Sequence, residues 1–319
     1  MPKAAGYCKL LFGQNSSENE CPLLREGMSL IEQIANHIAK VRISKLSEQH
    51  LTEYPQLAMF SFDCIANDIS LRGRYENDEL TYLENYILPN LEKPGTCLDV
   101  GANIGNHAVA FAPYFENVIA FEPNLRTFQL LGINANLFGN ITALNFGASS
   151  ISKIVEARQD PRNIGATAIK TSEDHNGSSV KFELVRIDDV KEVQESKQIT
   201  FMKLDIEGHE LEALNGAEQT IRMHRPIIAM EVLPGNIHDG STRELRFLFD
   251  LGYNWIYGFQ EAGWLGRSPR KVKNLARLLM TLVTGKRHSK AGILVPMKTL
   301  EERSYSMVLC SFDRLPTQC

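Results

Sequence analysis

The sequence lacks the signatures of several protein classes. None of its apolar runs approaches the about 18 residues that a membrane-spanning helix needs, and residues 14–18 are polar where a secretory leader would be basic and then apolar. The six cysteines form no Cys-x-x-Cys pair and no spacing typical of metal ligands. We therefore expect a cytoplasmic protein with free thiols that neither crosses a membrane nor is secreted.

The chain also has no large excess of charge of either sign. Its formal net charge at pH 7 is −4 and its pI is near 6.1, so it has no overall attraction to nucleic acid or to an anionic membrane. With 319 residues, 43% of them hydrophobic, it is long enough to bury a sizeable core. The composition indicates an ordinary globular protein.

The most informative stretch is residues 97–107. An apolar strand ends there in Asp99, and Gly101 and Gly105 follow just where a helix is predicted to begin. Glycines allow a ligand to approach the backbone closely, and the first turn of a helix presents unpaired N–H groups. The pattern is typical of a loop that binds a nucleoside-containing cofactor.

A second apolar strand, residues 118–121, ends in Glu122, about 20 residues beyond the loop, where an acid can accept both hydrogen bonds of a ribose diol. The dinucleotide fingerprint requires glycine at its first, third and sixth positions. This chain has Gly101, Asn103 and Asn106 there, which disfavours a nicotinamide or flavin cofactor. A cofactor without phosphates fits better, and S-adenosyl-L-methionine is the obvious one.

Several motifs in order resemble those of the FkbM-type S-adenosylmethionine-dependent methyltransferases, across roughly residues 73–233. They are residues 99–105 (DVGANIG), 121–123 (FEP), 188–189 (DD), 203–210 (KLDIEGHE), 215–217 (NGA) and 225–231 (RPIIAME). The resemblance implies a Rossmann-like class I methyltransferase fold. It also implies methyl transfer, usually to a hydroxyl oxygen of a sugar or other small metabolite.

The loops at this edge supply the expected cofactor-binding residues, which are Asp99, Gly101, Asn103, Gly105, Asn106, Glu122, Pro123, Gly147 and Ala148. Asn103 and Asn106 could bind the amino-acid end of the cofactor, although Asn106 could instead cap the helix that follows. Lys203 lies in a predicted buried strand and must therefore have a partner.

Apolar strands alternate with amphipathic helices, which predicts an α/β fold with a doubly wound, mostly parallel sheet. The expected strands cover residues 97–102, 117–122, 141–147, 199–205, 226–232, 254–259 and 305–312; the expected helices cover 76–88, 105–115, 125–138, 209–222 and 241–251. Polar, turn-prone residues at 148–198 predict an inserted hairpin over the sheet edge.

We expect a helical and flexible N-terminal segment, residues 1–72, before a methyltransferase domain at 73–319. Apolar residues at near-helical spacing from 29 to 46 predict an amphipathic helix. Such a helix most often packs on a core, but the same face could support a homodimer.

The candidate catalytic residues are Asp205, Glu207 and His209, which follow the fourth parallel strand within one helical turn. Any of them could orient an acceptor hydroxyl or take its proton, although the acids could instead cap the next helix. Glu231 ends the fifth strand and could bind the acceptor or pair with Arg225. These side chains could also ligate a divalent metal, but only their spacing supports this and we expect no metal site.

Residues 262–295 contain no acid but eight basic residues, interleaved with leucines at helical spacing. This basic segment could be a packed helix with a solvated face, a lid over the active site, a surface for a phosphorylated or lipid-linked substrate, or a peripheral membrane contact through 267–290. Residues 267–290 contain no Trp, Tyr or Phe, so we do not expect a nucleic-acid partner.

Two function classes follow. The first is an active methyltransferase for a small-molecule acceptor, with a nucleic-acid methyltransferase as the alternative within this class. The second is a cofactor-binding module without turnover that acts through a partner. Acids at every expected position of the site favour the enzyme.

Overall fold

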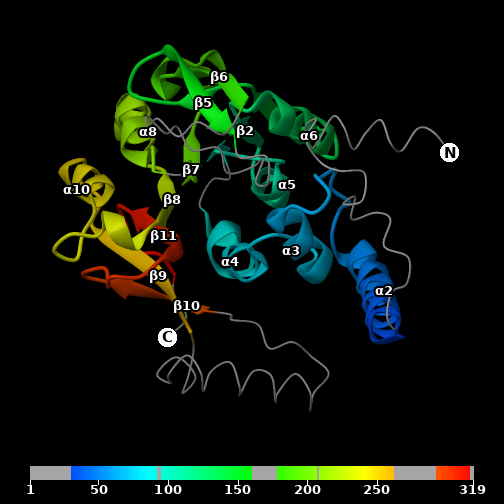
Figure 1. Cartoon of the computed structure of the whole chain (residues 1–319). Coiled ribbons are helices and arrows are strands. Elements are labelled where there is room, and N and C mark those ends of the chain that lie inside the picture. Colours follow the sequence, from blue (N-terminus) through cyan, green and yellow to red (C-terminus); the bar gives the residue numbers. More distant parts are fainter. Residues whose placement is uncertain (1–29, 92–94, 160–177, 207, 262–291, 317–319) are drawn as a thin grey trace. The chain divides into compact units, whose positions relative to one another are not determined.

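A computed structural model describes residues 30–91, 95–159, 178–206, 208–261 and 292–316 (Figure 1). The chain divides into two compact units, Met1–Thr52 and Glu53–Cys319. The first unit contains all but the last residue of the long helix α2 (Leu30–Glu53), and the apolar spacing predicted a helix here. Ile34, Ile38 and Val41, which were expected to face a core, are exposed on this helix.

The second unit is built on an eight-stranded sheet in the order β10-β9-β11-β8-β7-β1-β2-β3. Five neighbours, β8, β7, β1, β2 and β3, are parallel, whereas β11 pairs antiparallel with β8 and β9, and β10 pairs antiparallel with β9. The strands are β1 (Thr96–Val100), β2 (Asn117–Phe121), β3 (Ile141–Leu144), β7 (Ile199–Leu204), β8 (Ile227–Val232), β9 (Trp255–Glu261), β10 (Gly292–Met297) and β11 (Tyr305–Ser311). The predicted doubly wound, mostly parallel α/β fold is confirmed.

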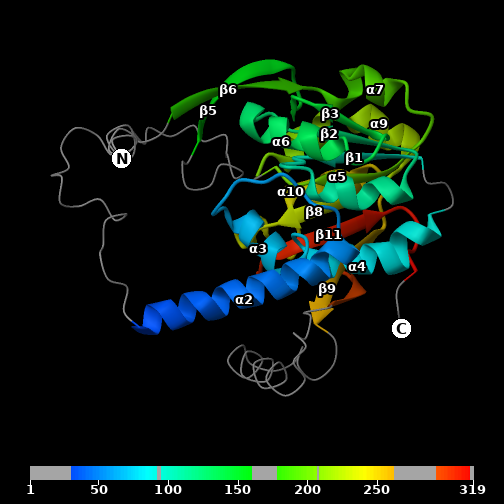
Figure 2. The ribbon, with the colours of Figure 1, turned by 90° about the vertical axis from the view of Figure 1, so that its right-hand side faces the viewer.

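Helices cover both faces of this sheet (Figure 2). The helices are α3 (Cys64–Arg72), α4 (Asn77–Tyr82), α5 (Asn106–Phe111), α6 (Leu125–Ala135), α7 (Lys191–Gln194), α8 (Glu210–Gly216), α9 (Glu218–His224) and α10 (Arg243–Asp250). A π-helical turn at Leu83–Ile87 and a 3₁₀ turn at Leu88–Asn90 extend α4, so the helical stretch predicted at 76–88 is present. Neither α3 nor β10 was predicted from the sequence.

The alternation of side chains along each strand produces two cores. Leu98 and Val100 of β1 pack in the core that includes residues of α8, α9 and α10, whereas Cys97 packs in the core that includes residues of α4 and α5. All three side chains are fully buried. Both faces of the parallel strands are therefore apolar, as a sheet covered by helices on both sides requires.

A buried amide ties residues before α3 to the sheet layer. The Asn134 side chain in α6 accepts a hydrogen bond from the Ala58 N–H at 2.7 Å and donates to the carbonyl oxygens of Ala58 and Ile104 at 2.9 and 2.7 Å. Asn134 is 1% exposed, so its full hydrogen bonding offsets the cost of burying an amide. The segment around residue 58 is thereby fixed beside the loop that follows β1.

The predicted hairpin at 148–198 is present. Strands β5 (Lys153–Gln159) and β6 (Ser178–Val185) pair antiparallel, and β4 (Gly147–Ala148) pairs parallel with β6. Phe182 and Leu184 of β6 are 2% exposed. This second, three-stranded sheet therefore brings apolar side chains to the edge where the cofactor loops were expected.

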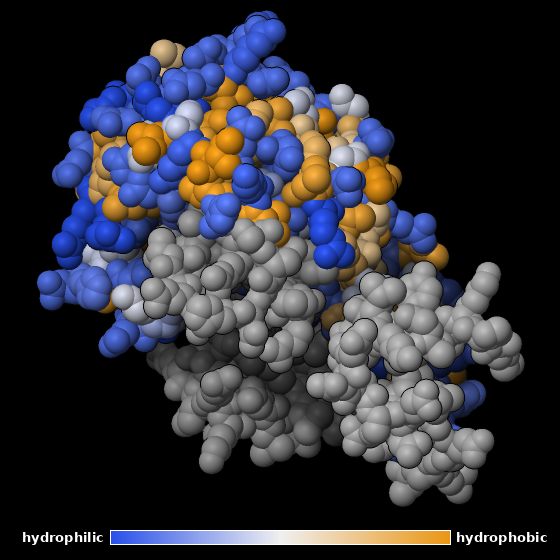
Figure 3. All heavy atoms as spheres, turned by 45° about the horizontal axis from the view of Figure 1, so that its top comes forward, coloured by the Kyte–Doolittle hydropathy of each residue, from blue (hydrophilic) through white to orange (hydrophobic). Residues whose placement is uncertain are grey.

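Residues 267–290 of the basic segment lie outside the described residues, and β10 begins just after them. Among the residues that the structure describes, no helix combines the length and the apolar character needed to span a bilayer. On the face seen in Figure 3, hydrophobic side chains form several separate patches between hydrophilic ones, as is usual for a globular protein surface.

Asp188, an acid of the family motifs, has a structural position. Its buried carboxylate accepts hydrogen bonds from the N–H groups of Gln219 and Thr220, at 3.1 and 2.9 Å, and from the Thr220 hydroxyl at 2.8 Å. These N–H groups belong to the first turn of α9, which has no side-chain cap of its own. Asp188 therefore caps α9 from a distant part of the chain.

We expect Asp188→Ala to lower the free energy of unfolding by about 1–3 kcal/mol, because it leaves buried donors without an acceptor. The matched control is Asp189→Ala. The Asp189 side chain is 57% exposed, so its loss should change stability by no more than about 0.5 kcal/mol. Urea unfolding of both variants checks the difference, and equal losses would show that Asp188 is not the cap.

Candidate functional site

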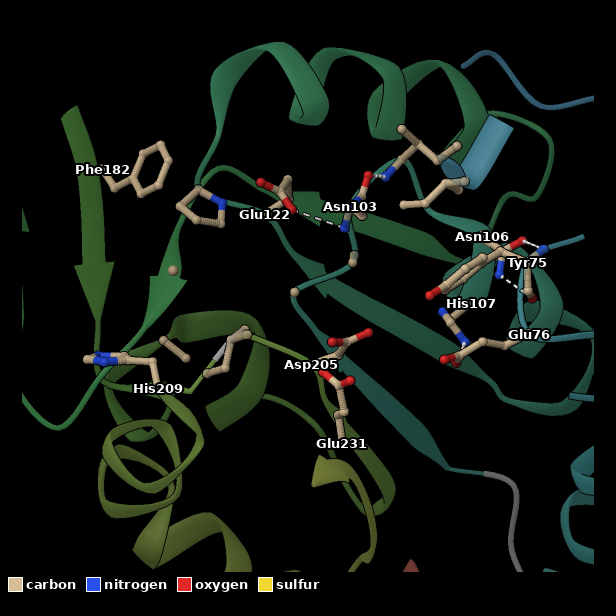
Figure 4. A pocket seen from close by; sticks show the side chains of 18 of the residues that line it. Tyr75, Glu76, Asn103, Asn106, His107, Glu122, Phe182, Asp205, His209 and Glu231 are labelled. Carbon is tan, nitrogen blue, oxygen red and sulfur yellow. Dashed lines mark hydrogen bonds and ion pairs between the residues drawn. The ribbon is translucent and has the colours of Figure 1, made fainter. Parts of the chain in front are cut away.

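A cavity of about 230 Å³ opens at the carboxyl ends of the parallel strands (Figure 4). Strand β1 is flanked by β2 on one side and β7 on the other, so the chain connections diverge at this point of the sheet. Open α/β sheets bind ligands in the crevice that such a switch point creates. The wall includes the loop after β1, Glu122, both residues of β4 and residues near the ends of β7 and β8.

At one end of the cavity Glu122 is held by two backbone donors. Its Oε2 accepts from the Asn103 N–H at 3.0 Å and its Oε1 from the Asn124 N–H at 2.8 Å (Figure 4). Burial raises the pKa of Glu122 to about 7, although these N–H groups pull it down. The carboxylate is therefore fixed at the wall with lone pairs still available to a ligand.

The loop after β1 owes its shape to backbone that only certain residues adopt. Gly101 has φ +81°, and a Cβ at this position would overlap the carbonyl oxygen of Asp205. Asn103 has φ +53° and accepts the Ile104 N–H through its own side chain at 2.8 Å. Both residues line the cavity, as predicted for a cofactor loop.

Two predicted cofactor residues lie behind the wall instead. Gly105 is the N-cap of α5 and has φ +90°, and a Cβ there would lie 2.7 Å from a methyl group of Leu131. Asp99 is fully buried in β1, and burial raises its pKa although the nearby Lys203 lowers it. Within the described residues neither one lines the cavity.

Lys203 of β7 has the partner that its burial demands. Its Nζ lies 3.0 Å from Asp205 Oδ2 and 3.9 Å from Asp99 Oδ1. Burial lowers the pKa of Lys203, but the two carboxylates raise it above its ordinary value. Burial would raise the pKa of Asp205, yet Lys203 holds it below the ordinary value. Asp205 therefore faces the cavity as a charged carboxylate.

Glu231 and His209 line different parts of the cavity. Glu231 of β8 lines the cavity, and Figure 4 shows it in the region of Asp205. His209 also lines it, on the side of Phe182, and its ring lies 3.1 Å from the Ser149 hydroxyl. Burial lowers the pKa of His209. Glu207 lies outside the described residues.

Pro123, Gly147 and Ala148 line the cavity together with Phe182 and Leu184 of the inserted hairpin. A Cβ on Gly147 would lie 2.5 Å from a Leu184 methyl group and 3.3 Å from Pro123. The absence of a side chain at Gly147 therefore lets the hairpin close against the loop after β2. This apolar wall beside Glu122 suits the flat face of a nucleobase.

A group of cavity residues just before α4 was not predicted from the sequence. Asn106, a predicted cofactor residue that also lines the cavity, accepts the Tyr75 N–H at 3.0 Å and donates to the Tyr75 carbonyl oxygen at 3.1 Å. The next residue of α5, His107, lies 3.0 Å from Glu76 through its Nε2. Burial raises the pKa of Tyr75, and the charges of Glu76 and Asp205 raise it further. These side chains form the wall opposite Glu122 (Figure 4).

The described residues contain no group of three or more His, Cys, Asp or Glu side chains arranged to hold a metal ion. At one end of the cavity lie a carboxylate that can accept the hydroxyls of a ribose, a glycine loop that a ligand can approach closely, and an apolar wall. Charged and hydroxyl groups lie at the other end. A loop whose backbone N–H groups bind a pyrophosphate has glycines at the positions that Asn103 and Asn106 occupy here, so the loop does not suit a dinucleotide. The residues present thus fit S-adenosyl-L-methionine.

Comparisons with known proteins agree with this arrangement. Residues 99–255 match the model of the methyltransferase FkbM domain. Over 137 residues the chain is 32% identical to the hexuronic acid methyltransferase AglP of Haloferax volcanii, and the alignment covers 43% of this chain and 55% of that protein. The chain therefore spans about half the length of this curated relative.

Solved structures of low sequence identity are also similar. A methyltransferase FkbM from Methylobacillus flagellatus is 16% identical with a TM-score of 0.34, over 86% of this chain and 60% of that chain. A precorrin-6y C5,15-methyltransferase from Geobacter metallireducens is 11% identical with a TM-score of 0.33, over 73% and 85%. The chain contains a methyltransferase FkbM domain at residues 99–255, which confirms the family that its sequence motifs predicted.

Proposed function

We propose that this domain binds S-adenosyl-L-methionine in the cavity and transfers the methyl group to a hydroxyl oxygen of a sugar or other small metabolite. The observation that carries the proposal is the Glu122 carboxylate, which two backbone N–H groups hold at the end of the cavity beside the glycine loop. In this arrangement Glu122 accepts the ribose hydroxyls, and the apolar wall of Phe182 and Leu184 receives the adenine.

The opposite end of the cavity suits a polyhydroxy acceptor. Asp205, Glu231 and the hydroxyl of Tyr75 converge there and can accept hydrogen bonds from sugar hydroxyls. The match to a hexuronic acid methyltransferase supports a sugar as the acceptor class.

The chemistry is mainly a matter of position. The bound cofactor supplies an electrophilic methyl group on a sulfonium, and displacement requires an acceptor oxygen in line with the bond that breaks. Asp205 stays charged because Lys203 lowers its pKa, so it can hold an acceptor hydroxyl by a charge-assisted hydrogen bond. The loop after β1 adjoins Asp205 at Gly101. A cofactor bound by this loop therefore lies next to that hydroxyl.

The test is methyl transfer from deuterated S-adenosylmethionine to a panel of neutral methyl glycosides and glucuronic acid glycosides, with product detected by mass spectrometry. Heat-denatured protein is the control. Mild alkali separates the two kinds of oxygen, because a methyl ester on a carboxylate is hydrolysed and a methyl ether on a hydroxyl is not. We expect an alkali-stable product.

Two other results contradict the proposal. A labelled product only with RNA or DNA would identify a nucleic-acid methyltransferase. Binding of the cofactor without labelling of any glycoside, or of any small molecule in a cell extract, would identify a module without turnover.

The raised pKa of Glu122 predicts a pH dependence of cofactor binding. The charged form accepts the ribose hydrogen bonds, and with a pKa of about 7 this form is lost as the pH falls. We expect S-adenosylhomocysteine to bind roughly tenfold more weakly at pH 6 than at pH 8. Glu122→Gln should bind S-adenosylhomocysteine weakly at both pH values, and its affinity should not change with pH. Calorimetry measures the affinity of both proteins at both pH values. An equal change of affinity with pH in the variant would show that a group other than Glu122 causes it.

A further inference from the structure

A histidine and a glutamate meet at the cavity wall opposite Glu122, and no role assigned above uses them. His107 Nε2 lies 3.0 Å from Glu76 Oε2, and the two side chains are only 6% and 14% exposed. Both residues line the cavity, and Figure 4 shows them beside Tyr75. They are 31 residues apart in the sequence, so only the fold brings them together.

The backbone around Glu76 is arranged to present this carboxylate. Glu76 has φ +51°, a left-handed conformation that is unfavourable for a residue with a side chain. Two contacts maintain it. Asn106 binds both backbone groups of Tyr75, and the Glu76 carbonyl oxygen accepts the Leu80 N–H at 3.0 Å. Backbone strain that is held in this way is characteristic of active sites.

The hydrogen bond to Glu76 determines which nitrogen of His107 can act. A carboxylate is only an acceptor, so Nε2 carries the proton that it binds. Nδ1 then carries the free electron pair of the neutral ring, and among the described residues no hydrogen bond occupies it. A carboxylate that orients an imidazole and stabilises its charged form is the arrangement by which enzymes prepare a general base.

We propose that His107 is the general base that takes the proton of the acceptor hydroxyl, and that Glu76 positions it. This proposal rests on the methyl transfer proposed above. It assigns the proton to a residue outside the segment that carries Asp205, Glu207 and His209.

The step balances without a further reactant. The acceptor oxygen forms its bond to the methyl carbon as the bond between that carbon and the sulfonium sulfur breaks, and the sulfur keeps the electron pair as a neutral thioether. The hydroxyl proton moves to His107 Nδ1. The imidazolium that results is stabilised by the carboxylate of Glu76 and by the nearby charge of Asp205, and it later releases the proton to water.

The other candidate bases are less suited to this task. The pKa of Asp205 lies below its ordinary value because of Lys203, so Asp205 is a weak base at neutral pH. His209 is bound to Ser149 and lies on the Phe182 side of the cavity, away from Asp205 (Figure 4). His107 instead has one ring nitrogen oriented by the carboxylate of Glu76, which is the geometry of a general base.

The first test needs no acceptor. Nitrogen-15 NMR of the imidazole rings in the free protein at pH 8 reports which nitrogen carries the proton, and the His107→Gln spectrum assigns the signal. We expect the proton of His107 on Nε2. A neutral ring with its proton on Nδ1 would overturn the proposal, whether or not an acceptor has been found.

The second test measures kcat with a glycoside that the wild-type protein methylates. His107→Ala should lower kcat by about 10²–10⁴-fold, leave the affinity for S-adenosylhomocysteine within about threefold, and recover activity with added imidazole. Glu76→Gln should lower kcat by about tenfold or more with the same affinity. The control is His238→Ala, since His238 is exposed; we expect its kcat to equal that of the wild type.

A folded His107→Ala protein that keeps the wild-type rate, or a slow one that imidazole does not restore, would overturn the proposal. If His107→Ala does not fold, His107→Gln replaces it in the rate comparison. A wild-type protein that binds S-adenosylhomocysteine but methylates no acceptor contradicts the proposed function instead, and the NMR result then decides the role of the pair.

Discussion

Gly101→Ala is expected to weaken the binding of S-adenosylhomocysteine by about a hundredfold or more. Two effects act together. Gly101 has φ +81°, which disfavours any residue with a side chain, and a Cβ would overlap the Asp205 carbonyl oxygen and lie 2.8 Å from the Ile206 side chain. The loops after β1 and β7 would have to separate, and they form adjoining parts of the cavity wall.

The matched control for this variant is Gly208→Ala. Gly208 also has a left-handed φ, +91°, but no atom lies within 4 Å of an added Cβ. It should lose about 1–2 kcal/mol of stability from the backbone conformation alone and keep its affinity. Calorimetry measures the affinity of both variants and thermal unfolding measures their stability. Together they separate the cost of the backbone conformation from the effect of the steric overlap with Asp205. Normal binding by a folded Gly101→Ala protein would show that the cofactor does not use this loop.

Asp205→Asn should lower kcat by about a hundredfold at saturating cofactor and leave the affinity for S-adenosylhomocysteine nearly unchanged. The physical reason is the loss of the charge that holds the acceptor hydroxyl. The change also removes the 3.0 Å partner of buried Lys203. Part of the stability must therefore be lost with it, up to about 3–5 kcal/mol if Asp99 does not compensate.

The two roles of Asp205 are separated by measuring rate and unfolding on the same protein. Rates are compared well below the melting temperature of the variant, so that unfolding does not contribute. A less stable variant that turns over at the wild-type rate would make Asp205 a partner of Lys203 and nothing more. A variant that is slow at a temperature where it is fully folded, whatever stability it has lost, would assign the charge to the acceptor.

The parallel sheet was predictable because its strands are short apolar runs separated by amphipathic helices. The strand at 97–102 and the strand at 117–122 were placed within two residues of β1 and β2. Strand β10 was missed because its first four residues lie inside the segment 262–295 that was read as basic, and because it contains Pro296, which is unusual in a strand. Helix α3 was missed because it has only nine residues, too few to show a clear helical period of apolar residues, although Asp63 supplies a capping signal.

The end of the cavity around Glu122 was predictable for a different reason. Its residues lie in loops directly after predicted strands, and parallel strands bring such loops to one edge. Asp99 shows where this reasoning ends. Its place after an apolar run suggested a ligand contact, but the side chain points beneath the loop toward Lys203.

The wall of the cavity around Tyr75 was not predictable from the spacing of residues in the sequence. Glu76 and His107 lie in separate helical regions and meet only because the segment before α4 packs on α5 through the Tyr75 and Asn106 contacts. A lone histidine after a glycine loop carries no signal in the sequence. A left-handed Glu76 is a feature of the folded backbone alone.

The proposed function requires this cavity to bind an S-adenosyl group rather than a dinucleotide. Calorimetric titration of the wild-type protein at pH 8 with S-adenosylhomocysteine and, separately, with NAD⁺ tests it most directly. The structure predicts binding of S-adenosylhomocysteine at a single site and no heat from NAD⁺, because Asn103 and Asn106 stand where a pyrophosphate loop requires glycine. Binding of NAD⁺ without binding of S-adenosylhomocysteine would contradict the proposed function.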